Sequence, residues 1–223
     1  MAQIGAGVTL GPGIAITAPP VYGSYVFNTT AWMDVLGTTT DWDLGTTWTI
    51  EWWSNAANTS APSNLYTVMC QTPGNNQIDV FYQNGRLIVN NGTDLCAEPT
   101  PGVWTHVAIS QLSGVLKVFY NGVQVGTSAN YNLQNLTDYV TVGRRGNNNF
   151  QYFNGELAGM RVNNTAVYTS DFNCYTPAVL YPQNIPGTVL LLKGLQTNPY
   201  VDSSNSAHSI APTDMSWSSN YPS

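Results

Sequence analysis

The segment from residue 115 to residue 125 reads VLKVFYNGVQV and places the pair Asn121-Gly122 between two β-prone runs. An Asn-Gly pair in this position is the strongest short signal for a β-hairpin, because both central residues of a type I′ turn need a positive φ. The same signal recurs at Asn84-Gly85, between the runs 78–82 and 86–89. The sequence therefore predicts two tight hairpins, with strands over 115–120 and 123–125 in the first.

Further β-prone runs lie on both sides of these hairpins, and none of the chain has the periodicity of a long amphipathic helix. Many short strands separated by turn residues indicate a β-sandwich or a barrel. Within one of these runs Trp52 and Trp53 point to opposite faces of their strand, so one should lie in the core and the other should cover the second face. The remaining predicted strands are 22–27, 48–53, 65–70, 104–110, 139–142, 156–162 and 188–192.

Composition limits the classes of partner. The 223 residues suit one large β domain, and the net charge of −6 with six basic residues argues against nucleic-acid binding. No apolar run approaches the roughly 20 residues of a membrane span, so membrane insertion is not expected. Charged residues are only 8% of the chain, against about 25% in ordinary soluble domains. Such a surface suits a crowded assembly or hydrogen bonding to neutral ligands.

The first twenty residues form an arm that carries no charge and is rich in glycine and proline. It lacks the basic start of a secretory signal, so no cleaved signal is expected. Its apolar residues need burial, yet its glycines and prolines prevent a core of its own. We therefore divide the chain into an extended arm, residues 1–20, and a β domain, residues 21–223. The arm is expected to pack on another subunit; the alternative is that it completes an edge of its own sandwich.

The candidate catalytic and metal-binding residues are few. The three glutamates are Glu51, Glu98 and Glu156, and none has an acidic neighbour at the close spacing that would place two carboxylates across a sugar ring. His106 and His208 accompany no nucleophile-elbow motif. These absences predict a protein that is not an enzyme, with His106 in a structural role.

Cofactor and cysteine chemistry are equally sparse. Asp41 and Asp43 could offer oxygen ligands to Ca²⁺, but no acid-dense loop follows them, so a solvated turn is the expected reading and no cofactor is predicted. The spacing of Cys70, Cys96 and Cys174 matches no zinc motif. Buried free thiols are expected, and a Cys70–Cys96 disulfide is the alternative.

Several segments, taken in order, resemble the laminin-G-like jelly rolls of the concanavalin A-like lectin/glucanase superfamily. Residues 102–108 (GVWTHVA) resemble the family's G-x-W-T-H-V-A strand, and residues 116–126 (LKVFYNGVQVG) resemble the hairpin that follows it. The remaining matching segments are 24–27 with 48–53, 142–143, 153–157 and 161–162. The resemblance implies an all-β fold, a jelly-roll β-sandwich of two antiparallel sheets.

The C-terminal third resembles the laminin-G-like domains of structural proteins of marine bacteriophages, cyanophages especially. Residues 165–172 (TAVYTSDF) precede an LLL strand at 190–192, Asp202-Ser203-Ser204 and His208. In the common family layout this strand precedes the first one, whereas here it comes last, so the closing strand is expected to pair beside the first.

This resemblance implies a virion structural protein, from the capsid or the tail, that displays a lectin-like jelly roll. Its expected partners are other virion proteins, reached through the arm, and host-surface glycans, and it is expected to form a homo-oligomer within the virus particle. A secreted carbohydrate-binding module and a glycoside hydrolase remain the alternatives.

One loop combines the groups that sugar recognition needs, amides for the hydroxyls and aromatic rings for the apolar sugar face. It follows Arg144-Arg145 and is predicted to contact carbohydrate; the alternative is an ordinary Asn-rich surface loop. The candidate binding residues are Arg145, Asn147, Asn148, Asn149, Phe150 and Tyr152.

Overall fold

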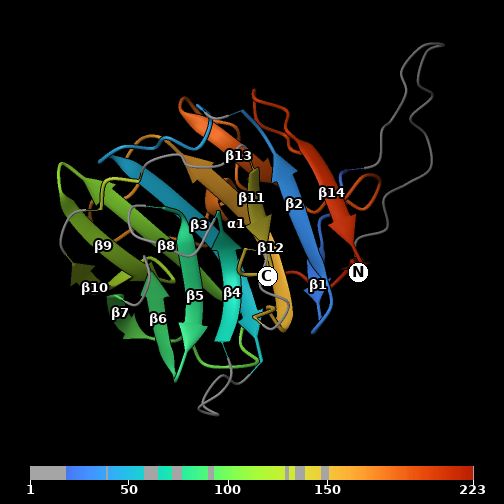
Figure 1. Cartoon of the computed structure of the whole chain (residues 1–223), viewed down its shortest axis with the longest axis horizontal. Coiled ribbons are helices and arrows are strands. Elements are labelled where there is room, and N and C mark those ends of the chain that lie inside the picture. Colours follow the sequence, from blue (N-terminus) through green and yellow to red (C-terminus); the bar gives the residue numbers. More distant parts are fainter. Residues whose placement is uncertain are drawn as a thin grey trace, which may run out of the picture.

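The computed structural model describes residues 19–38, 40–57, 65–71, 77–89, 93–128, 131–133, 139–146 and 151–222. Over these residues the chain forms two antiparallel sheets packed face to face (Figure 1). The sheets confirm the predicted jelly-roll β-sandwich. In these ranges the only helix is α1, Pro177–Leu180, and no helix is long and apolar enough to cross a membrane.

The first sheet has the strand order β10-β9-β8-β3-β12-β1-β15, and β13 also pairs with β12. Its strands are β1 Ser24–Phe27, β3 Trp48–Ala56, β8 Thr105–Leu112, β9 Val115–Tyr120, β10 Val123–Ser128, β12 Gly155–Asn163, β13 Thr188–Leu192 and β15 Ser216–Ser218. The second sheet has the order β14-β2-β11-β4-β5-β6-β7. Its strands are β2 Trp32–Leu36, β4 Leu65–Cys70, β5 Asp79–Gln83, β6 Arg86–Val89, β7 Thr93–Ala97, β11 Tyr139–Val142 and β14 Ser209–Thr213.

Both Asn-Gly pairs form the predicted two-residue hairpin loops. Asn84 and Gly85 have φ values of 53° and 73°, and Asn121 and Gly122 have φ values of 47° and 81°. The flanking residues pair across each loop, as in Tyr120 with Val123. Gly122 is also fixed by packing, because a Cβ there would lie 1.9 Å from the carbonyl oxygen of Phe172.

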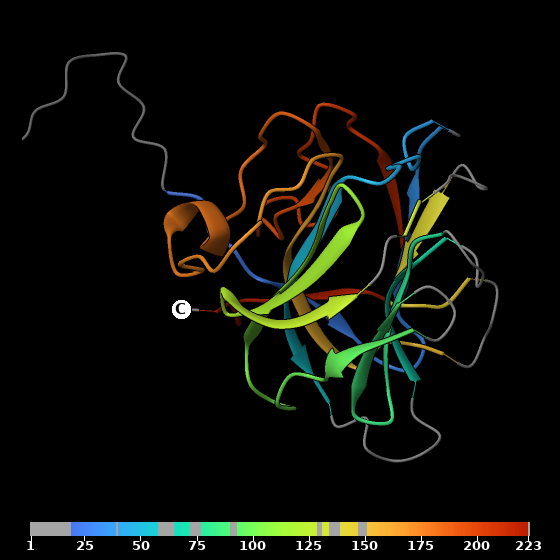
Figure 2. The same cartoon turned by 90° about the vertical axis from the view of Figure 1, so that its left-hand side faces the viewer.

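The paired tryptophans divide between two clusters, as expected from their alternation along β3. Trp52 lies in the core between the sheets, whereas Trp53 lies on the outer face of the eight-stranded sheet. The segment that contains α1 covers this outer face (Figure 2), and Trp53 Nε1 donates a hydrogen bond of 3.4 Å to the carbonyl oxygen of Val179. The cover therefore seals a second, smaller core.

The expected pairing of the closing LLL strand with the first strand is wrong. β13 pairs with β12, whereas β1 lies between β12 and β15. β1 and β13 lie on the same edge of β12 and meet end to end, where the Gly23 amide donates to the Gly194 carbonyl oxygen at 2.9 Å. The chain places two further strands, β14 and β15, after this strand.

The described beginning and end of the chain lie on the α1 side of the eight-stranded sheet (Figure 2). Tyr181, just after α1, stacks on Tyr22 with ring centres 4.4 Å apart and on Tyr221 at 5.4 Å. Residues 1–18 of the arm lie outside the described residues, so its packing partner stays a prediction.

All three cysteines are free and buried, as the preferred reading of the sequence expects. Burial raises the pKa of the Cys70, Cys96 and Cys174 thiols, and only the thiolate is an effective nucleophile. We therefore expect Ellman's reagent to modify none of them in the native protein and all three in denaturant. Rapid modification of one thiol under native conditions would contradict this placement.

Candidate functional site

The loop predicted to bind carbohydrate is described only at its two ends. Asn147, Asn148, Asn149 and Phe150 lie outside the described residues, whereas Arg145 and Tyr152 lie within them. Arg145 is held by the buried carboxylate of Asp79, with Nε 3.1 Å from Oδ1 and Nη2 2.7 Å from Oδ2. Its guanidinium carbon also lies 4.4 Å from the centre of the Phe81 ring. This bidentate pair fixes the start of the loop on β5.

Arg144 and Tyr152 meet a residue that the sequence analysis did not single out. Their backbones form an isolated antiparallel bridge, and the Arg144 guanidinium carbon lies 4.2 Å from the centre of the Trp32 ring. The Tyr152 ring lies 5.9 Å from the same indole, at 43°. Because side chains alternate along β2, Trp32 and Asp34 face outward while their neighbours enter the core. Arg144 Nη2 lies 3.8 Å from Asp34 Oδ1.

These outward side chains, together with Gln151, form the Trp32 cluster: Trp32, Asp34, Arg144, Gln151 and Tyr152. Three of its polar atoms are buried and have no hydrogen-bond partner among the residues that the structure describes, namely Trp32 Nε1, Arg144 Nε and Gln151 Oε1. Leaving such an atom unsatisfied costs about 1–3 kcal/mol, and few occur in native proteins. A local shift of the cluster would let a polar ligand reach two donors and one acceptor beside an aromatic ring.

The carboxylate of Glu51 lies on the opposite sheet and is part of a closed ionic network. Its Oε2 accepts hydrogen bonds from Tyr168 Oη at 2.7 Å and from His106 Nε2 at 3.0 Å, and its Oε1 accepts one from Arg161 Nε at 2.5 Å. Burial alone would raise the pKa of Glu51, but the bond from His106 and the charge of Arg161 hold it below its usual value. Glu51 is therefore an ionised, fully engaged carboxylate.

Asp41, one of the two residues considered as calcium ligands, serves a turn of the backbone. Asp41 Oδ2 accepts from the amide of Thr38 at 2.6 Å and from its hydroxyl at 2.8 Å, which is the arrangement of a capped turn. Within the described part of the chain, no group of three or more His, Cys, Asp or Glu side chains is placed to hold a metal ion. Glu156 accepts hydrogen bonds from Ser24 and Asn55.

Comparison with known proteins identifies the same fold. A family model described as the concanavalin A-like lectin/glucanases superfamily, Laminin_G_3, matches residues 27–171. A protein from Bacteroides ovatus, described as a "putative carbohydrate binding protein", superposes with a TM-score of 0.63 at 14% identity, over 90% of this chain and 60% of its own. The botulinum neurotoxin serotype D binding domain superposes with a TM-score of 0.50 at 13% identity, over 66% of this chain and 40% of its own. No match was found among curated proteins.

Proposed function

The chain belongs to the concanavalin A-like lectin/glucanases superfamily, whose model covers more than half of it, and on that premise we propose that it is a non-catalytic carbohydrate-binding domain. The observation that carries the proposal is the Trp32 cluster on the outer face of the seven-stranded sheet. A sugar ring presents an apolar C–H face and a rim of hydroxyls, and binding sites for such ligands combine apolar walls with a few convergent polar groups.

The geometry of the cluster suits this kind of ligand. The half-buried rings of Trp32 and Tyr152 can lie against the C–H face of a sugar. Trp32 Nε1 and Arg144 Nε can donate to ring or hydroxyl oxygens, and Gln151 Oε1 can accept from a hydroxyl. Two of these three contacts come from neutral groups, an indole and an amide, and Arg144 supplies the one charged donor.

Two of the three glutamates, Glu51 and Glu156, support a binding role over hydrolysis. A retaining glycosidase needs one carboxylic acid that donates a proton and a second carboxylate that attacks the sugar. Glu51 is ionised, buried and bonded to three side chains, so it can neither donate a proton nor reach a substrate. Glu156 is bonded to neighbouring side chains on another part of the sheet.

We expect Trp32→Ala and Tyr152→Ala each to weaken glycan binding by about tenfold or more, because each removes an aromatic contact and Trp32→Ala also removes a donor. The glycan is first identified on an array and then titrated by calorimetry. Tyr175→Ala is the matched control, since Tyr175 is an aromatic residue, 56% exposed, that lies near Trp53 on the other sheet. Equal binding by wild type, Trp32→Ala and Tyr152→Ala would overturn the proposed surface.

We further propose that the domain is a structural component of a phage particle, in the capsid or the tail, that contacts host-surface glycans. Its uncharged arm, residues 1–20, would pack on other virion proteins or on a second copy in a homo-oligomer. The described chain begins on the α1 side, on the sheet opposite the Trp32 cluster, so assembly contacts there would leave the glycan surface free.

Mass spectrometry of purified virions tests this placement. A particle-bound protein should co-purify with virions in constant proportion, and removal of residues 1–18 should leave a folded monomer that no longer assembles. A protein found free in the medium and absent from particles would identify a secreted carbohydrate-binding module instead.

A further inference from the structure

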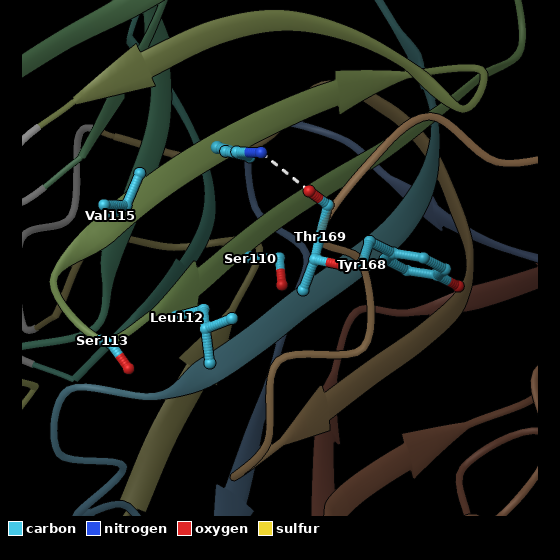
Figure 3. A pocket seen from close by; sticks show the side chains of 7 residues that line it. Ser110, Leu112, Ser113, Val115, Tyr168 and Thr169 are labelled. Carbon is cyan, nitrogen blue, oxygen red and sulfur yellow. Dashed lines mark hydrogen bonds between the residues drawn. The ribbon is translucent and has the colours of Figure 1, made fainter.

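A cavity lies on the outer face of the eight-stranded sheet, away from the Trp32 cluster. It has a volume of about 310 Å³ and lies between the β8–β9 hairpin and the segment that follows β12 (Figure 3). The residues that line it are Ser110, Leu112, Ser113, Val115, Lys117, Tyr168 and Thr169. Ligand cavities range over about 300–1,000 Å³, so this one suits a single sugar ring.

The pairing of β8 with β9 arranges the wall of the cavity. Ser110 pairs with Lys117 and Leu112 with Val115, so all four side chains lie on the same face of the hairpin. Leu112 is 46% exposed and Val115 is 51% exposed, which leaves an apolar cross-strand pair in contact with water. The polar pair lies farther from the hairpin turn, beside Tyr168 and Thr169.

Lys117 brings a positive charge to the wall of the cavity. Its ammonium donates one hydrogen bond, of 2.7 Å, to the carbonyl oxygen of Thr169. In the described part of the chain no carboxylate lies within 4.0 Å of it, whereas Arg86, Arg144, Arg145 and Arg161 each have one. An ammonium group has three donors, so two remain for an anion in the cavity.

The hydroxyl oxygen of Ser110 can accept a hydrogen bond in the cavity, as the assignment of the Thr49 and Ser110 hydroxyl protons shows. Thr49 Oγ1 donates its only proton to the carbonyl oxygen of Thr165, at 2.9 Å. Ser110 Oγ lies 2.9 Å from Thr49 Oγ1, so Ser110 must be the donor in that bond. Its proton is then engaged while its lone pairs remain available. Ser110 is only 2% exposed, so the acceptor sits at the floor of the cavity.

We propose that this cavity binds a sugar that carries a carboxylate. The carboxylate accepts hydrogen bonds from Lys117, a ring hydroxyl donates to Ser110, and the apolar ring face packs on Leu112 and Val115. The hydroxyls of Ser113 and Thr169 lie at the rim. This site is separate from the Trp32 cluster, so the domain would hold two glycans on opposite faces. Because the domain carries a net charge of −6, the attraction of an anionic sugar depends on Lys117. The affinity for that sugar should therefore fall as salt is added.

The test titrates methyl glucuronide, its neutral methyl ester and octanoate into the ¹⁵N-labelled domain by NMR. We expect the glucuronide to shift the amide signals of residues 110–117 and 168–169, with the ester about tenfold weaker, as loss of a charge-assisted bond implies. Lys117→Gln should weaken glucuronide binding by a similar factor, and Lys117→Arg should retain most of it. Lys193→Gln is the control for loss of a lysine charge elsewhere.

Three results would overturn the proposal: equal binding of acid and ester, no loss in Lys117→Gln, or binding of octanoate in preference to the glucuronide, which would indicate a lipid site. Trp32→Ala should leave glucuronide binding unchanged. A failure of this cavity is therefore distinguishable from a failure of the Trp32 cluster.

Discussion

Replacing Arg161 with methionine is expected to destabilise the domain by about 3–5 kcal/mol, the range found when one partner of a buried ion pair is removed. Arg161 is 3% exposed and lies on β12, where its guanidinium contacts Glu51 on the neighbouring strand β3. Methionine keeps much of the side-chain volume, so the main loss is the charge that balances the buried Glu51 carboxylate. In this variant Glu51 loses the guanidinium that pairs with it and keeps the hydrogen bonds from Tyr168 and His106.

Urea denaturation at pH 7 measures this loss, and Arg86→Met is the matched control. Arg86 also pairs with a carboxylate, Asp94, but both side chains are more than 40% exposed, and exposed pairs contribute little. The double variant Glu51→Leu with Arg161→Met should recover much of the stability, because removing both charges leaves no unpaired ion. Equal midpoints for Arg161→Met and Arg86→Met would contradict a stabilising role for the network.

Local signals predicted most strands but none of this network. The runs 65–70, 86–89, 115–120, 139–142 and 188–192 match strands to the residue, because β-branched and aromatic residues and Asn-Gly turns act over short stretches. Glu51, His106, Arg161 and Tyr168 are brought together only by strand order and by the covering segment. The spacing of the acidic residues argued against a catalytic pair that contains Glu51. No residue near Glu51 in the sequence, however, identifies the side chains that bond to its carboxylate.

The strands that were missed are β2, β7, β14 and β15, which have three to five residues each. β14 reads SIAPT and contains a proline, which an edge strand tolerates because one side of its backbone makes no ladder bonds. It pairs only with β2, at the edge of its sheet. Its formation depends on that neighbour, which no local pattern reveals.

The candidate binding surface was also predictable only in part, because some of its residues are close in sequence and others meet only in the fold. The aromatic and amide composition after Arg145 directed attention to the loop that ends beside the Trp32 cluster, but Trp32 itself lies much earlier in the chain, on β2. Trp32-Met33-Asp34-Val35 alternates outward and buried side chains, and that period of two was a usable signal for a strand with an exposed tryptophan. The contact between Trp32 and Arg144 was not predictable, since it depends on β2 pairing with β11.

Replacing Asp202 with asparagine is the second change expected to have a large effect, about 3–5 kcal/mol, because it removes a buried, paired charge. Asp202 is 4% exposed. It accepts hydrogen bonds from the amides of Leu191, Ser204 and His208, each at 2.9 Å, and from Ser204 Oγ at 2.8 Å and His208 Nδ1 at 2.7 Å. These bonds join β13 to the turn that leads into β14. An asparagine side chain presents an NH₂ group to one set of these donors.

The pH dependence of stability separates loss of this charge from a general loss of packing. Burial by itself lowers the pKa of His208, but Asp202 and, beyond it, Asp41 raise it above its ordinary value of 6.5. Asp202 has a pKa below its ordinary 3.8, since the bonds from His208, Ser204 and Leu191 outweigh the effect of burial. The His208 contribution is therefore complete below pH 6.5 and is lost as pH rises through the raised pKa. The Asp202 contribution is present above pH 3.8 and is lost as pH falls further.

Wild-type stability should accordingly decline on the alkaline side of pH 6.5, and Asp202→Asn should flatten that decline, because the imidazolium then loses its closest counter-charge. Thermal unfolding of both proteins from pH 4 to pH 9 measures the difference. His208→Gln should flatten the alkaline decline in the same way while leaving Asp202 ionised. Asp43→Asn is the control, because Asp43 is an exposed carboxylate in the same turn as Asp41 and none of its atoms contributes to the His208 shift. An Asp202→Asn profile parallel to that of wild type across this range would show that Asp202 acts through packing alone.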